Sequence, residues 1–86
     1  MSELLPEPAA KLDVHEVEDG FVIYDLASER VHYLNETASF VFALCTGKND
    51  AARIAEVVQG AWELPELPTE QVSECLEQLR GEGLIT

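Results

Sequence analysis

RVHYLNETASFVFALC, residues 30–45, is the stretch that decides the fold, because the pattern of apolar residues changes at Asn35. Before Asn35 the chain is rich in β-branched and aromatic residues, which is typical of a strand. Asn35 itself is a favoured N-cap, since its side-chain oxygen can accept from the free N–H groups of a first helical turn. The apolar residues that follow cover most sides of a helix, so they predict a central helix packed by neighbours on more than one face.

Upstream of Asn35 the sequence predicts a meander of three short strands. The expected strands cover residues 13–18, 20–26 and 29–34. Asp19-Gly20 lies between the first two runs, and this dipeptide is a strong hairpin signal. Residues 27–29 make the second tight connection.

Downstream, the spacing of apolar residues predicts two further helices. Gly47 ends the first helix, Asp50 caps the second, and Pro65 and Pro68 prevent the second from continuing through residues 63–68. The expected apolar stripe of the second helix is Ile54, Val57, Val58, Ala61 and Trp62. Thr69 is the expected cap of a third helix over residues 69–82, with an apolar stripe of Val72, Cys75, Leu76 and Leu79.

Strands followed by helices indicate an α+β fold rather than a parallel α/β sheet. A three-stranded antiparallel sheet followed by three helices is the winged helix-turn-helix-like architecture. The 86 residues form one domain at most. We expect residues 1–11, which contain Pro6 and Pro8, to form a flexible N-terminal tail and residues 12–86 to form the domain.

The charge of the chain narrows the classes of partner. Seventeen acidic residues against five Lys and Arg give a formal net charge of −12. Such a surface repels phosphate backbones and anionic membranes and favours partners with basic surfaces. The N-terminus lacks the positive region of a secretory signal, and no run of residues is apolar enough to span a membrane. We therefore expect a cytoplasmic protein with reduced thiols and neither nucleic-acid nor membrane partners.

The sequence offers no catalytic motif. His15 and His32 have no nucleophile elbow nearby, and Cys45 and Cys75 lie in apolar, helix-like runs without CxxC spacing. We expect no enzyme activity, no metal and no cofactor.

The class of function that remains is binding. A free strand edge can accept a peptide as an additional strand, or it can be blunted by charge, and the residues alone leave both alternatives open.

The segment GFVIYDLASERVHYLNETASFVFALCTGKNDAARIAEVV, residues 20–58, and the closing VSECLEQLRGEGLI, residues 72–85, resemble the PqqD-like family. The shared pattern is two strands, then His-x-Leu-Asn at residues 32–35 running into a small apolar helix. A polar turn with Gly47 and a Gly-Leu-Ile end complete it. The segments HYLNETA and GFVIYD are most similar to the corresponding segments of family members encoded beside relatives of HPr kinase.

The resemblance implies a RiPP recognition element, a peptide chaperone that binds the leader of a ribosomally made precursor peptide and presents it to a peptide-modifying enzyme. The leader would add to the third strand and lie against the third helix. The implied peptide-binding residues are Glu29, Arg30, Val31, His32, Tyr33, Leu34, Val72, Cys75, Leu76, Leu79 and Arg80.

Within the third helix we expect Leu76 and Leu79 to belong mainly to the core, with Val72 and Cys75 nearer the groove. The protein is expected as a monomer or a homodimer. The alternatives are a winged-helix DNA-binding or regulatory protein and a structural subunit whose strand edge pairs with itself.

Overall fold

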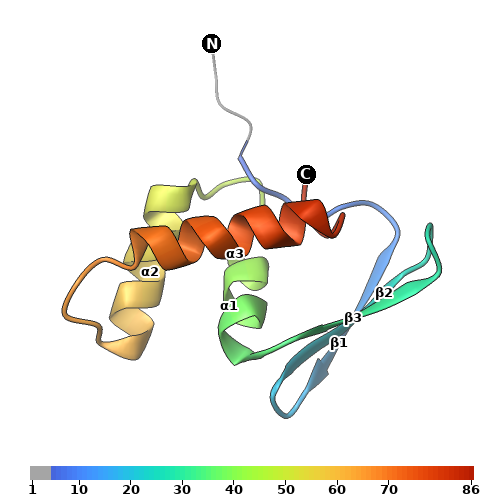
Figure 1. Ribbon diagram of the computed structural model, residues 1–86, viewed down its shortest axis with the longest axis horizontal. Helices are drawn as coiled ribbons and strands as arrows, with labels where there is room; N and C mark the ends of the chain where they lie inside the picture. Colours follow the sequence, from blue (N-terminus) through green and yellow to red (C-terminus); the bar gives the residue numbers. More distant parts are fainter. Residues whose placement is uncertain (1–4) are drawn as a thin grey trace.

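The computed structural model describes residues 5–86. Its elements in chain order are β1 (Leu12–Val17), β2 (Gly20–Asp25), β3 (Arg30–Leu34), α1 (Glu36–Leu44), α2 (Ala51–Trp62) and α3 (Thr69–Gly81). The three strands form one antiparallel sheet in the order β1-β2-β3, and the three helices lie together to one side of it (Figure 1). The predicted α+β architecture is therefore confirmed.

The hairpin between β1 and β2 turns one residue earlier than expected. Val17 pairs with Gly20, so the two turn residues are Glu18 and Asp19, and Gly20 is the first residue of β2. Gly20 has a φ of 149°, and a Cβ atom there would overlap the backbone carbonyl oxygen of Leu34 and lie 2.7 Å from Ser39 Oγ. The glycine therefore serves a close approach between β2 and the junction of β3 with α1.

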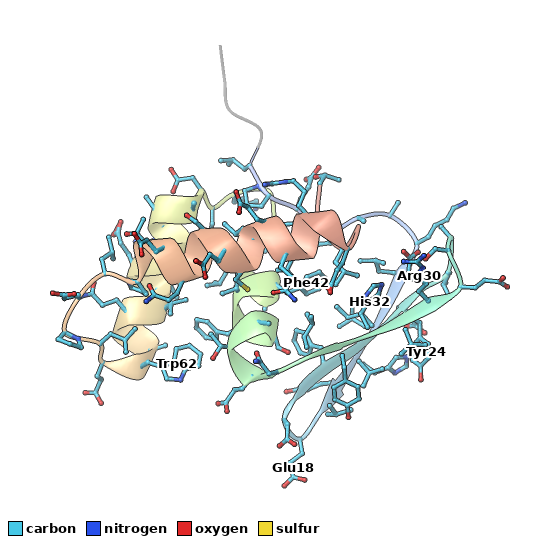
Figure 2. The ribbon with its side chains drawn as sticks, in the orientation of Figure 1. Glu18, Tyr24, Arg30, His32, Phe42 and Trp62 are labelled. Carbon is cyan, nitrogen blue, oxygen red and sulfur yellow. The ribbon has the colours of Figure 1, made fainter. Side chains whose placement is uncertain are left out.

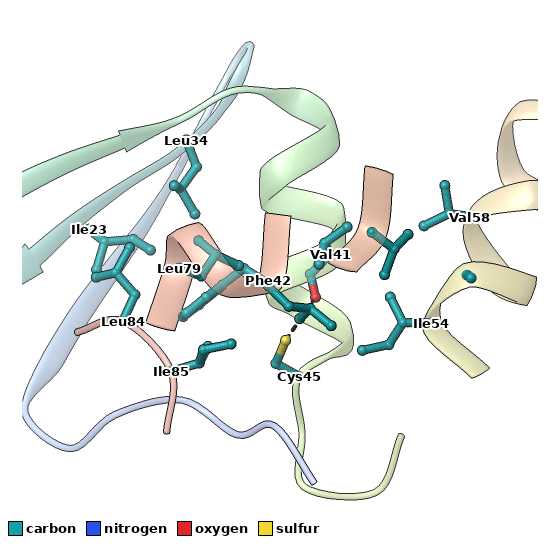
Figure 3. Packing of buried hydrophobic residues seen from close by; sticks show 13 residues of the cluster. Ile23, Leu34, Val41, Phe42, Cys45, Ile54, Val58, Leu79, Leu84 and Ile85 are labelled. Atoms are coloured by element: carbon teal, nitrogen blue, oxygen red, sulfur yellow. Dashed lines mark hydrogen bonds between the residues drawn. The ribbon is translucent and has the colours of Figure 1, made fainter. Parts of the chain in front are cut away.

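The core lies between the inner face of the sheet and the helices. Ile23 and Leu34 from the sheet meet Phe42 of α1 and Leu79 of α3, and Ile54 joins them from α2 (Figure 3). The complete cluster of buried apolar residues is Ile23, Leu34, Val41, Phe42, Cys45, Ile54, Ala55, Val58, Val72, Leu76, Leu79, Leu84 and Ile85. Burial on several sides confirms α1 as the central helix.

Side chains cap two of the three helices as expected. Asn35 accepts from the backbone N–H of Ala38 at 2.8 Å, and Asp50 accepts from that of Arg53 at 2.8 Å. The prediction that Thr69 caps α3 is wrong. Pro68 is the N-cap and provides no side-chain hydrogen bond. Thr69 N donates to the carbonyl of Leu67 at 2.8 Å, and this tight turn places Thr69 inside the first helical turn.

Part of the predicted tail is instead joined to the domain. Pro8 forms an isolated antiparallel bridge with Ile85, and Pro6 is buried. The bridge consists of two bonds, from Thr86 N to the carbonyl of Glu7 and from Ala9 N to that of Leu84, and a further bond runs from Gly47 N to the carbonyl of Pro6. The expectation of a loose tail fails over residues 5–10 because these backbone groups find partners, whereas residues 1–4 lie outside the described part of the chain.

The predicted stripe of α2 ends sooner than expected. Ile54 and Val58 are buried, Val57 is half-buried, and Ala61 and Trp62 are exposed. Ala55, which the prediction omitted, is buried. The last turn of α2 projects beyond the core and then stops, because Glu63 adopts a left-handed backbone conformation with a φ of 50°.

Candidate functional site

The edge of β3 is the first component of the candidate site. β3 ends the sheet on one side, and no strand within residues 5–86 pairs with its outer edge. A free edge presents unpaired backbone N–H and C=O groups that another chain can join. β1 forms the other edge, so the surroundings of the two edges must distinguish them.

The β3 edge differs from the β1 edge because a groove lies beside it. Within the described residues, no Cα atom of α3 comes within 8 Å of a Cα atom of β3, whereas α1 packs against both. The space between the strand and α3 is a pocket of about 130 Å³. We call it the β3–α3 groove, and its lining residues are Tyr33, Leu34, Asn35, Ala38, Cys75, Gln78, Leu79 and Glu82. A chain that paired with β3 would therefore lie beside α3.

The residues of β3 divide between the two faces of the sheet. His32 faces the helices (Figure 2), and Leu34 lies on the same face and is buried in the core (Figure 3). By the alternation of side chains along a strand, those of Val31 and Tyr33 project from the opposite face and are 59% and 74% exposed, and Tyr33 also borders the groove. Arg30 is exposed at the start of the strand.

Glu29, which the sequence placed in the third strand, lies in the preceding turn. Its φ is 58°, in the left-handed region, so its backbone does not continue the strand. The strand edge available for pairing therefore begins at Arg30.

The apolar stripe of α3 belongs to the core. Val72, Leu76 and Leu79 are 3%, 5% and 2% exposed. The expectation that Val72 lies nearer the groove is wrong, because Val72 sits one turn before Leu76 on the same buried stripe. Cys75, about 60° around the helix axis from Val72, is only partly buried and lines the groove. Of these three core residues, Leu79 also lines the groove, whereas Val72 and Leu76 are not among its lining residues.

Arg80 is on the wrong flank of α3 for the expected contact. It lies about 80° from Val72 in the opposite direction to Cys75. There it lines a different pocket together with Leu5 and Pro6. The structure brings Gln78 and Glu82 to the groove instead, and the sequence analysis missed both. Their spacing from Cys75, at i+3 and i+7, is the signal that would have found them.

His32 lies between the sheet and the C-terminal end of α3 (Figure 2). Its side chain is 12% exposed, and its Nδ1 atom lies 4.0 Å from Oε2 of Glu82. Its Nε2 atom is buried and has no hydrogen-bond partner among the described residues. An unsatisfied buried nitrogen costs free energy, so His32 gains from any donor or acceptor that reaches it.

The chemistry of the site does not include an activated thiol. Burial raises the pKa of the Cys75 thiol above its ordinary value, and burial raises that of Cys45 to about 11. Cys45 donates to the carbonyl of Val41 at 3.2 Å inside the core. A neutral thiol is a poor nucleophile, so both cysteines act as apolar packing groups at neutral pH.

Among residues 5–86, no group of three or more His, Cys, Asp or Glu side chains is arranged to hold a metal ion. No helix there is both long and apolar enough to cross a bilayer.

Residues 20–85 match the family model described as Coenzyme PQQ synthesis protein D (PqqD). No curated protein matches the chain significantly. A solved structure described as "Lasso peptide synthetase B1 complexed with the leader peptide" has a similar fold, with a TM-score of 0.81 and 18% sequence identity. The alignment covers 95% of this chain and 98% of the other.

Proposed function

Since the chain belongs to the PqqD family, we propose that it is a peptide chaperone that binds the leader of a ribosomally made precursor peptide. The leader adds as a strand to the free edge of β3, lies in the β3–α3 groove, and is presented to a modifying enzyme. The observation that carries the proposal is a free strand edge with a groove beside it. The similar structure is that of a synthetase protein in complex with a leader peptide, which supports the same role here.

The alternation of hydrogen bonds in antiparallel sheets indicates which residues of β3 would receive the leader. Gly20 closes the two-residue hairpin to β1, so even-numbered residues of β2 bond to β1 and odd-numbered residues bond to β3. Ile23 pairs with His32, which therefore directs its N–H and C=O groups toward β2. We infer that Val31 and Tyr33 direct theirs to the free edge.

Charge supports selectivity for a basic leader. The exposed side of α3 carries Glu70, Glu74 and Glu77, and Glu82 follows at the groove. Lys or Arg side chains of a leader would be attracted to these carboxylates, while the main-chain hydrogen bonds would accept any sequence. Main-chain pairing supplies the affinity in this proposal, and the groove and its charge supply the selectivity.

We further propose that the protein has no catalytic activity of its own and that it acts in the cytoplasm, where ribosomal precursors first appear. It does not bind nucleic acid, because a net charge of −12 opposes contact with phosphates. The leader and a second copy of the chain would compete for one edge, so strand-to-strand dimerisation would reduce leader binding.

Backbone amide shifts would test the proposal. The ¹⁵N-labelled protein is titrated with a synthetic peptide that covers the leader of the precursor encoded beside its gene. We expect the amides of residues 30–34 and those of Cys75 and Gln78 to shift and to saturate together. A scrambled peptide of the same composition serves as the control. Saturable binding that leaves residues 30–34 unmoved would place the site elsewhere.

A further inference from the structure

A second, apolar pocket opens beside the N-terminal end of α3. Its volume is about 430 Å³, and its main lining residues are Trp62, Leu64, Pro65, Leu67, Pro68 and Gln71. Trp62, Leu64 and Leu67 are 37%, 36% and 44% exposed. We call it the Trp62 pocket. Apolar side chains that converge on a hollow, rather than being scattered over a surface, are typical of a binding site.

The walls of this pocket are held in place. The Trp62 ring meets the ring of Phe40 edge-on, with centroids 4.8 Å apart. Leu64 N donates to the carbonyl of Gln59 at 3.0 Å, and Gln59 Nε2 donates to the carbonyl of Leu64 at 3.3 Å. Pro65 and Pro68 restrict the backbone between the helices. A loop fixed in this way keeps its pocket open and loses little entropy when a ligand binds.

The Trp62 pocket lies further along the same flank of α3 as the β3–α3 groove. Gln71 lines the pocket, and Cys75 and Gln78 line the groove, so the three lie at i, i+4 and i+7 on the same flank. α1 joins the two hollows as well, because Thr37 lines the pocket and the adjacent Ala38 lines the groove. A peptide that leaves the Leu34 end of β3 along α3 arrives at the Trp62 pocket.

The rise of α3 gives the distance between the groove and the Trp62 pocket along this path. Gln71 and Gln78 are seven residues apart, which corresponds to about 10 Å along an α-helix. An extended peptide covers about 10 Å in roughly three residues. We propose that the Trp62 pocket takes one apolar side chain of the leader peptide, roughly three residues beyond the segment that pairs with β3. This inference rests on the proposed function and adds a second anchoring point and a spacing rule to it.

Trp62 is the only tryptophan in the chain, so it reports on its own pocket. The probe is the synthetic leader of the precursor encoded beside the gene, with any tryptophan replaced by phenylalanine. We expect a blue shift of Trp62 emission that saturates at the same peptide concentration as the amide shifts of residues 30–34. Replacing the apolar residues of the peptide by serine, one at a time, should abolish the blue shift at a single position outside the pairing segment.

A matched pair of protein variants tests the same contact. Leu67→Ser removes an exposed apolar wall of the pocket, and we expect leader binding to weaken about tenfold. Leu26→Ser removes a leucine that is 61% exposed in the turn between β2 and β3, away from the pocket, and should bind the leader like the unmodified protein. Thermal unfolding of both variants checks that each is folded.

The outcomes separate the inference from the function on which it rests. If residues 30–34 shift while Trp62 emission and the affinity of Leu67→Ser are unchanged, the pocket is not part of the leader site and the inference fails alone. If residues 30–34 do not shift, the proposed function fails. A Trp62 response to protein concentration without peptide, or to the modifying enzyme alone, would assign the pocket to another occupant and overturn the inference.

Discussion

Proline at Val31 is the sharpest test of strand addition. The Val31 side chain is 59% exposed on the outer face of the sheet, so its loss alone should matter little. Its N–H is inferred to point to the free edge, and proline removes this donor. A hydrogen bond contributes about 0.5–1.5 kcal/mol net, so Val31→Pro should weaken leader binding about 2- to 12-fold relative to Val31→Ala. Fluorescence anisotropy of a labelled leader peptide measures both affinities.

Stability provides an independent check on the direction of that N–H. If it faces solvent in the free protein, Val31→Pro should change the free energy of unfolding by no more than about 1 kcal/mol relative to Val31→Ala. His32→Pro should cost more, because His32 is inferred to bond to β2 and the proline would break the sheet. Equal leader affinity of the proline and alanine variants at Val31 would refute strand addition at this residue. Strong destabilisation by Val31→Pro would refute the assigned direction.

Three further predictions concern the scaffold and the thiols. Gly20→Ala should lower the free energy of unfolding by about 2–4 kcal/mol, because the new Cβ would overlap the backbone oxygen of Leu34 in a backbone conformation that side chains disfavour; chemical denaturation measures the loss. Asn35→Ala should cost about 1 kcal/mol through loss of the α1 cap, and Asn35→Asp should retain most of it; equal stabilities would refute a capping role. At pH 7.5 Cys75 should react with iodoacetamide more slowly than free cysteine, and Cys45 more slowly still, because raised pKa values leave less thiolate. Both rates should rise as the pH increases, and a fast reaction of Cys75 at neutral pH would contradict the burial that raises its pKa.

Local signals made most of the fold predictable. The change of periodicity at Asn35 separated the sheet from the helices, and the caps at Asn35 and Asp50 were found because a short polar side chain there precedes an apolar helical stripe. Thr69 misled because it looks like a cap by the same rule. The tight turn at Pro68 decides otherwise, and the sequence does not report turn geometry of this kind.

The site was less predictable, because it depends on which flank of α3 faces β3. The apolar stripe located the core correctly but said nothing about the flanks, so Arg80 was assigned to the groove and Gln78 was missed. The Trp62 pocket was missed because an aromatic residue on a helical stripe is expected to be core. Its exposure follows from the end of α2, which only the structure locates. The similarity to members encoded beside relatives of HPr kinase stays a prediction.

The bridge between Pro8 and Ile85 has a practical consequence for joining this domain to another. Both terminal segments meet beside the Arg80 flank of α3, with Leu5 and Pro6 against that helix, while the leader would bind on the Cys75 flank. A partner enzyme tethered through a linker after Thr86 would therefore start on the far side of the helix from the cargo. Such a fusion leaves the peptide path unobstructed and raises the effective concentration of enzyme around the bound precursor, to a degree that the length of the linker sets.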